Sequence, residues 1–118
     1  QELHDRYHHS RRMQSQHPAL GLVFQKINSD YADSSLTPDS VAQHCGLSVR
    51  SLNRLLKEQG YPPLSASILE ARIRAAKKLL ERSNLTLDQV AFTVGFKEYT
   101  TFFRAFKKSE GVAPSHYQ

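Results

Sequence analysis

The residues best suited to ligate a metal lie in the first 16 positions, QELHDRYHHSRRMQSQ. On a helix, His4 and His8 would share one face, and His9 would follow them. The segment shows no apolar period that would fold it into a helix, and no cysteine lies close by. We therefore interpret residues 1–16 as a linker or disordered arm and expect no metal site there.

A second candidate for chemistry is the neighbouring pair His44 and Cys45. A cysteine attacks as its thiolate, and nothing near Cys45 in the sequence would lower its pKa, so we interpret it as a small core residue. A catalytic His44 would need a partner that the helical periodicity does not place. The chain also has no glycine-rich phosphate loop, paired catalytic carboxylates or Cys-x-x-Cys motif. We expect neither enzymatic activity nor a cofactor.

The net charge favours a polyanionic partner. The chain has 16 Lys and Arg residues against 11 Asp and Glu residues, a formal charge of +5. The preference is modest, since many basic proteins bind no polyanion. The single cysteine fits a reducing compartment, and no apolar run approaches the roughly 20 residues that span a bilayer. These features predict a cytoplasmic protein without membrane contact.

Apolar periodicity predicts an all-α domain over residues 17–118. The expected elements are a packing helix from Pro18 to about Tyr31, a helix-turn-helix over about 37–60, a long helix over about 67–83, and a second helix-turn-helix over about 86–110. On the long helix we expect apolar residues such as Leu69 to face inward and basic residues such as Arg72 to face mostly outward.

Helix boundaries carry the clearest local patterns. Thr37-Pro38-Asp39 supplies a cap, a proline at the first helical position and an acidic residue in the first turn. Ser48 caps the helix VRSLNRLLKEQ. Thr86 and Gln89 have the spacing of a capping box, and Gly95 lies where a helix end favours positive φ.

The two helix-turn-helix patterns are copies of one unit. Val41-Ala42-Gln43-His44-Cys45-Gly46-Leu47 aligns with Val90-Ala91-Phe92-Thr93-Val94-Gly95-Phe96 at an offset of 49. With one extra residue in the second turn, Leu52, Arg54, Leu56 and Lys57 align with Phe102, Arg104, Phe106 and Lys107. Accidental similarity between two hairpins of a helical bundle is the alternative.

A repeated unit changes how the chain could read DNA. A single helix-turn-helix usually needs a dimer to reach two major-groove faces about 34 Å apart. The long helix of about 17 residues would span roughly 26 Å, so one chain could hold both units. A monomer could then insert two recognition helices into adjacent major-groove segments.

The C-terminal motif resembles that of the AraC/XylS family of bacterial transcription regulators. The matching residues are Gly95-Phe96-x3-Thr100-x-Phe102-x-Arg104-x-Phe106-Lys107-x3-Gly111-x2-Pro114-x2-Tyr117. The first unit and Arg72-x3-Ala76-x2-Leu79-Leu80 are similar to the same family. The resemblance implies about seven helices in a tandem, homeodomain-like arrangement of two units joined by a linker helix. It also implies sequence-specific binding of double-stranded DNA, activation through RNA polymerase, and, in most members, a separate N-terminal effector-binding and dimerisation domain.

By position, the resemblance also implies which residues contact DNA. The base contacts would be Arg50, Ser51, Asn53, Arg54, Tyr99, Thr100 and Arg104. The phosphate contacts would be Ser48, Lys57, Lys97, Thr101 and Lys107. Arginine suits guanine O6 and N7, and asparagine suits adenine N6 and N7. The alternative is a helical protein-interaction module that retains the fold without specific DNA binding, which Phe103 faintly favours.

Overall fold

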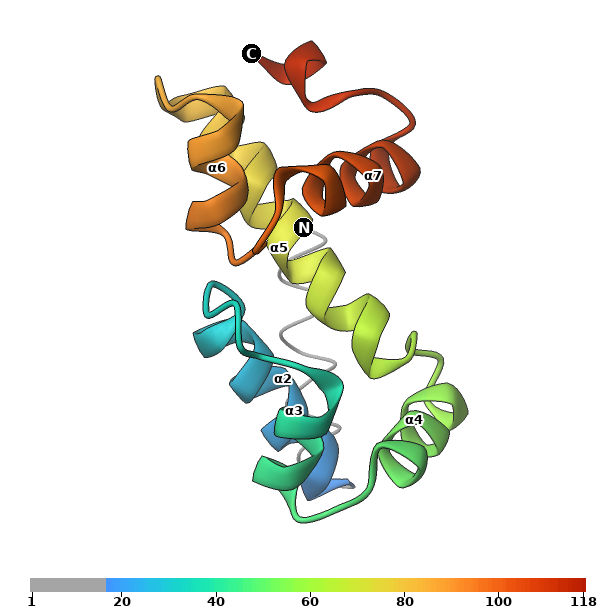
Figure 1. The fold of residues 1–118 in the computed structure, drawn as a ribbon. Helices are drawn as coiled ribbons and strands as arrows, with labels where there is room; N and C mark the ends of the chain where they lie inside the picture. Colours follow the sequence, from blue (N-terminus) through green and yellow to red (C-terminus); the bar gives the residue numbers. More distant parts are fainter. Residues whose placement is uncertain (1–16) are drawn as a thin grey trace. The chain divides into compact units, whose positions relative to one another are not determined.

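The computed structural model describes residues 17–118, and the arm predicted for residues 1–16, with His4, His8 and His9, lies outside them. Residues 17–118 form helices and no strand. The elements are α2 (Pro18–Asp30), α3 (Pro38–Cys45), α4 (Val49–Glu58), α5 (Leu64–Arg82), α6 (Leu87–Thr93), α7 (Tyr99–Glu110) and the 3-10 helix η1 (Pro114–Tyr117) (Figure 1). The all-α fold with two helix-turn-helix units is confirmed.

The described chain divides into two compact units. The first comprises residues 17–29 and Thr37–Ser67, and therefore contains α2, α3, α4 and the first turn of α5. The second comprises Asp30–Leu36 and Ile68–Gln118, with the rest of α5, α6, α7 and η1. Each unit holds one helix-turn-helix.

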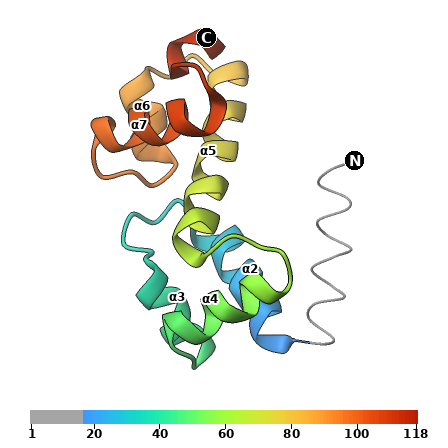
Figure 2. The same cartoon turned by 90° about the vertical axis from the view of Figure 1, so that its right-hand side faces the viewer.

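In the first unit, α3 and α4 lie next to each other, as Figure 2 shows. Thr37 and Ser40 form a capping box at the start of α3, and Gly46 ends the helix in the left-handed conformation with φ 72°. Ser48 accepts a hydrogen bond from the Ser51 N–H and so starts α4. The core consists of apolar side chains with no exposed surface, among them Leu20, Val23, Val41, Leu52, Leu56 and Leu64.

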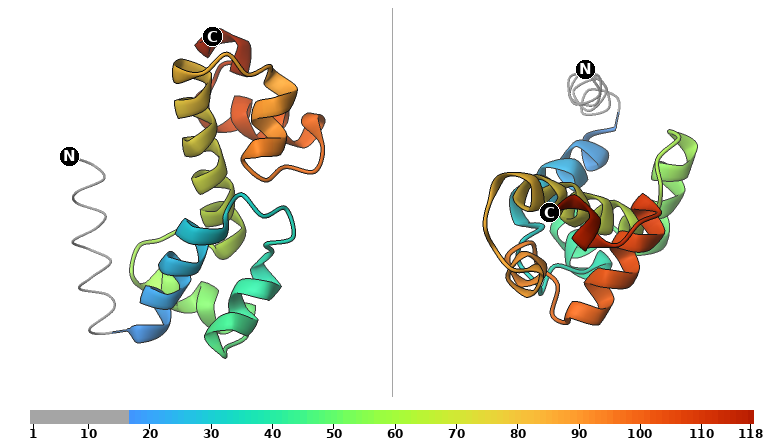
Figure 3. Two further views of the ribbon diagram at one scale, coloured as in Figure 1. Left: turned by 90° about the vertical axis from the view of Figure 1, so that its left-hand side faces the viewer. Right: turned by 90° about the horizontal axis from the view of Figure 1, so that it is seen from above.

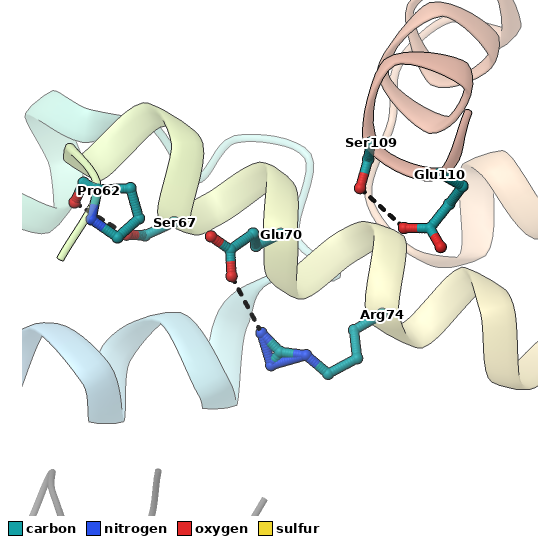
Figure 4. A network of polar contacts seen from close by, with 6 residues as sticks. All are labelled: Pro62, Ser67, Glu70, Arg74, Ser109 and Glu110. Carbon is teal, nitrogen blue, oxygen red and sulfur yellow. Dashed lines mark hydrogen bonds and ion pairs between the residues drawn. The ribbon is translucent and has the colours of Figure 1, made fainter. Parts of the chain in front are cut away.

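The long helix α5 begins at Leu64, three residues before the predicted start near Ser67. Asn53, on α4, accepts the Leu64 N–H on its Oδ1 atom at 2.9 Å. Ser67 Oγ donates to the Pro62 oxygen at 3.4 Å, as Figure 4 shows. These bonds satisfy groups of the first turn, which lets the helix start directly after Pro63.

The second unit is built on an aromatic core. Figure 3 shows α6 and α7 beside the C-terminal part of α5. The rings of Phe102 and Phe106 are fully buried, with centroids 5.7 Å apart, and the Phe96 ring lies 5.4 Å from Phe102. Thr86 and Gln89 form the predicted capping box of α6. Leu69 of α5, expected to face inward, is 38% exposed.

The repeat is visible in burial. Val41 and Val90, Ala42 and Ala91, Leu52 and Phe102, and Leu56 and Phe106 are all buried. Three aligned pairs around the turn differ, since Cys45, Gly46 and Leu47 are partly or largely exposed, whereas Val94, Gly95 and Phe96 are buried. Each unit therefore buries the same inner helix positions, and the turn is part of the core only in the second unit.

Arg72 does not face outward as the sequence predicted. Its side chain is 8% exposed and bonds the main chain of the segment before α3. Its guanidinium carbon also lies 5.8 Å from the centroid of the Phe96 ring. In this helix-turn-helix unit a basic residue is thus part of the core.

Candidate nucleic-acid interface

The outward face of α4 is basic. Leu52 and Leu56 bury the inner face, so helical geometry places Arg50, Arg54 and Lys57 on the opposite side, where all three are exposed. Among residues 17–118, no hydrogen bond or ion pair engages these three side chains. Their donors are therefore available to a polyanion.

Three other predicted contact residues, the cap residue Ser48 and Ser51 and Asn53 of α4, take part in hydrogen bonds within the first unit. Ser48 Oγ accepts the Ser51 N–H at 3.0 Å and donates to Ser51 Oγ, also at 3.0 Å. Asn53 is partly buried and binds the Leu64 N–H through Oδ1. Ser51 keeps its hydroxyl proton and Asn53 keeps its Nδ2 group for another partner.

The outward face of α7 mixes hydroxyl and basic groups. Thr100, Thr101, Arg104 and Lys107 are exposed, opposite the buried Phe102 and Phe106. Lys97 is exposed just before the helix. Glu98 occupies the cap position without a side-chain cap bond, so no cap side chain covers the first N–H groups of α7.

Tyr99 and Phe103 lie on the flank of α7 rather than at the centre of its outward face. The Tyr99 ring centroid lies 5.9 Å from that of Phe102 and 6.2 Å from that of Phe103. Tyr99 also packs against the buried core cluster of the second unit. Its position three residues before Phe102 puts both on one helical face, a signal that sequence reasoning missed.

No other site emerges in residues 17–118. They contain no group of three His, Cys, Asp or Glu side chains that could hold a metal ion. Burial raises the pKa of the Cys45 thiol, which disfavours the nucleophilic thiolate. None of the described helices is both long and apolar enough to cross a membrane.

Comparison with known proteins agrees with this geometry. Residues 41–118 match the model of a family described as a helix-turn-helix domain. The chain is 37% identical over 98 residues to the arabinose operon regulatory protein of Escherichia coli K12, which covers 80% of this chain and 32% of that protein. The chain belongs to the AraC/XylS family of transcription regulators.

The chain is also similar to a second regulator and to a solved structure. An uncharacterised HTH-type transcriptional regulator of Mycobacterium tuberculosis is 40% identical over 89 residues, covering 74% of this chain and 26% of that protein. The C-terminal domain of AraT, a response regulator from Geobacillus stearothermophilus, has a TM-score of 0.80 and 30% identity, covering 85% of this chain and 83% of that chain. The chain thus spans only 26% to 32% of the length of these two curated relatives.

Proposed function

We propose that this chain is the sequence-specific DNA-binding part of a bacterial transcription regulator. Its recognition helices α4 and α7 enter adjacent major-groove segments of double-stranded DNA. The observation that carries the proposal is the unpaired basic face of α4, which lies opposite Leu52 and Leu56 in a helix-turn-helix. A groove-binding helix needs such a face, because base edges and phosphates are read mainly by donors.

The side chains divide into two roles within this proposal. Arg50, Ser51, Asn53, Arg54, Tyr99, Thr100 and Arg104 read base edges. Lys57, Lys97, Thr101 and Lys107 contact phosphates and set the register of the helices on the duplex. Ser48 joins them by turning its hydroxyl proton from Ser51 to a phosphate oxygen. Because Tyr99 packs against Phe102, it can reach DNA only through the exposed part of its ring and its hydroxyl.

Family membership supports a proposal about the wider role. We place the chain on bacterial DNA in the cytoplasm, where it regulates transcription and activates it through contact with RNA polymerase. An N-terminal effector-binding and dimerisation domain is the further partner that the family resemblance implies. The alternative, a protein-interaction module without DNA binding, has less support, because the Phe103 ring packs against Tyr99.

Selection of bound sites from random duplexes tests the proposal. We expect two motif halves separated by about one helical turn. The logarithm of the affinity for the selected duplex should fall linearly with the logarithm of salt concentration, because phosphate contacts release counterions. Recovery of no motif, or binding that does not change with salt, would contradict sequence-specific DNA binding. A single short motif would leave one recognition helix without a base-reading role.

A further inference from the structure

Asn53 occupies an unusual place for a DNA-reading side chain. It lies on the flank of α4, three residues after Arg50 and four before Lys57, so these three project from neighbouring positions of the helix surface. Unlike the exposed Arg50 and Lys57, it is partly buried and reaches the first residue of α5. The side chain therefore borders both the core and the face that we assign to DNA.

The acceptor atom of the Asn53 amide, Oδ1, already has a hydrogen-bond partner. Oδ1 binds the Leu64 N–H at 2.9 Å, and Leu64 has no exposed surface. Leu64 opens α5, so its N–H has no partner within the helix. Turning the amide around would leave this buried donor unpaired, which proteins rarely tolerate.

The donor group of the Asn53 amide, Nδ2, can bind a partner outside the protein. Because the amide is planar, fixing Oδ1 on Leu64 directs Nδ2 to the other side of the group. Among residues 17–118, no hydrogen bond uses the two Nδ2 protons. Asn53 can therefore donate to the groove, while its oxygen stays on the protein.

We propose that Asn53 reads the major groove as a donor only and selects guanine or thymine. The usual asparagine contact with adenine requires both ends of the amide, since Oδ1 accepts from N6 and Nδ2 donates to N7. With Oδ1 occupied, the remaining donor suits the acceptors O6 and N7 of guanine or O4 of thymine, and it opposes the N4 donor of cytosine. Adenine offers this donor only N7, with the N6 donor beside it, and is therefore the poorer purine. This inference rests on the proposed function and replaces the adenine contact that the sequence suggested.

The neighbouring side chains of α4 also offer hydrogen-bond donors rather than acceptors. Arg50 and Arg54 have donors and no acceptor. Ser51 Oγ already accepts from Ser48, which leaves its proton to donate. Glu58, at the last position of α4, is the acidic residue of this helix. The first two turns of the helix are thus suited to a half-site rich in groove acceptors.

The variant Asn53→Asp tests the donor role of the side chain separately from its acceptor role. One carboxylate oxygen can still accept the Leu64 N–H, while the other replaces the Nδ2 donor with an acceptor. We expect site selection with this variant to change one position of the motif from guanine or thymine to cytosine, whose N4 donates to a carboxylate. The preference at this position should be about five- to a hundredfold, and the other positions should keep their bases.

Two controls accompany this variant. Asn53→Ala removes both ends and should give no preference at that position. Arg54→Ala should alter a different position. Thermal unfolding of each variant reports whether the α5 start is retained. If Asn53→Asp does not fold, the wild-type chain is tested on a duplex with 7-deazaguanine for guanine, or with a thymine analogue lacking O4, and the inference requires a loss of affinity.

The outcomes are distinct. An unchanged motif with uniformly weaker binding by Asn53→Asp would show that Asn53 only caps α5, and it would overturn this inference while leaving the proposed function standing. Adenine at the responding position of the wild-type motif would overturn it as well. A wild-type chain that selects no motif would overturn the proposed function and this inference together.

Discussion

Arg72 Nε donates to the main-chain oxygen of Tyr31 at 2.8 Å, across 41 positions of sequence. Its Nη2 atom donates to the oxygens of Asp33 at 2.9 Å and Leu36 at 3.4 Å. Burial lowers the pKa of Arg72, and the charge of Asp33 opposes that effect. One guanidinium therefore holds the segment between α2 and α3 on the second unit, through acceptors that belong to the backbone.

We expect Arg72→Met to lower the free energy of unfolding by about 2–4 kcal/mol, because it leaves several main-chain oxygens without their charged donor. Arg82→Met is the matched control, since Arg82 is exposed on the same helix and should change stability by no more than about 0.5 kcal/mol. Urea unfolding measures both. Equal losses for the two variants would mean that the Arg72 bonds contribute nothing particular.

Gly95 should tolerate no side chain. Its φ is 109°, and an added Cβ would contact the Tyr31 oxygen and lie 2.8 Å from Arg72 Nε. We expect Gly95→Ala to destabilise by about 3 kcal/mol or more, since backbone strain adds to a clash in the core.

Gly46 supplies the control for this prediction. It has φ 72° and nothing within 4 Å of an added Cβ, so Gly46→Ala should cost only the conformational strain of about 1–2 kcal/mol. The comparison is made by thermal unfolding. If the two variants lost the same stability, the close approach of Tyr31 to Gly95 would be of no consequence.

Local patterns were enough to predict most of the fold. The capping box at Thr86 and Gln89 and the positive φ of Gly95 involve residues within a few positions of one another. Their physical cause lies in the backbone groups of one helix end, so it can be read from a short window. The repeat supplied the rest, because two copies of one pattern require two copies of one hairpin.

The features that sequence reasoning did not foresee mostly depend on partners far along the chain. Asn53 accepts the first N–H group of α5 from 11 positions away in the sequence. Arg72 binds main-chain oxygens 36 to 41 positions away. A charged residue on an amphipathic helix is ordinarily expected to face solvent, and only the tertiary fold supplies the carbonyl oxygens that permit burial. Tyr99 is different, since its spacing from Phe102 already indicated the inner flank.

The C-terminal end of α7 carries a polar network with a defined pH dependence. Lys77 Nζ lies 2.9 Å from Glu110 Oε1, Tyr117 donates to the same oxygen at 3.2 Å, and Ser109 donates to Oε2 at 2.8 Å, the last shown in Figure 4. Burial would raise the pKa of Glu110, but the hydrogen bonds from Lys77 and Ser109 outweigh it, so the pKa is lowered. The hydrogen bond to Glu110 raises the pKa of Lys77.

These pKa shifts predict the pH ranges in which stability is lost. The contribution of Glu110 is present above the pKa of its unfolded state and disappears as pH falls through the lower folded value. That of Lys77 is present below its unfolded pKa and disappears as pH rises through the raised folded value. We expect Lys77→Met to flatten the acid limb of the stability curve, whereas Lys78→Met, at an exposed neighbouring site, should leave it unchanged. Urea unfolding at a series of pH values decides, and parallel acid limbs for wild type and Lys77→Met would refute the assignment.

Arg54 and Lys57 allow the two proposed roles on α4 to be separated. Both are exposed basic residues of one helix, so their substitution by alanine removes the same formal charge from the same face. Arg54→Ala should cost about 1–3 kcal/mol on the selected duplex and relax specificity at one base pair. Lys57→Ala should weaken binding to all duplexes alike and reduce the salt slope by about 1.

Affinity for the selected duplex, for its single-base variants and for an unrelated duplex, each measured over a range of salt concentrations, distinguishes these results. A base-reading residue changes the ratio between the selected duplex and one variant, since its partner is present in only one of them. A phosphate contact leaves every ratio unchanged, because all duplexes offer the same backbone. If both variants left the ratios unchanged, Arg54 would contact phosphate, and the base reading of α4 would have to come from Arg50, Ser51 and Asn53.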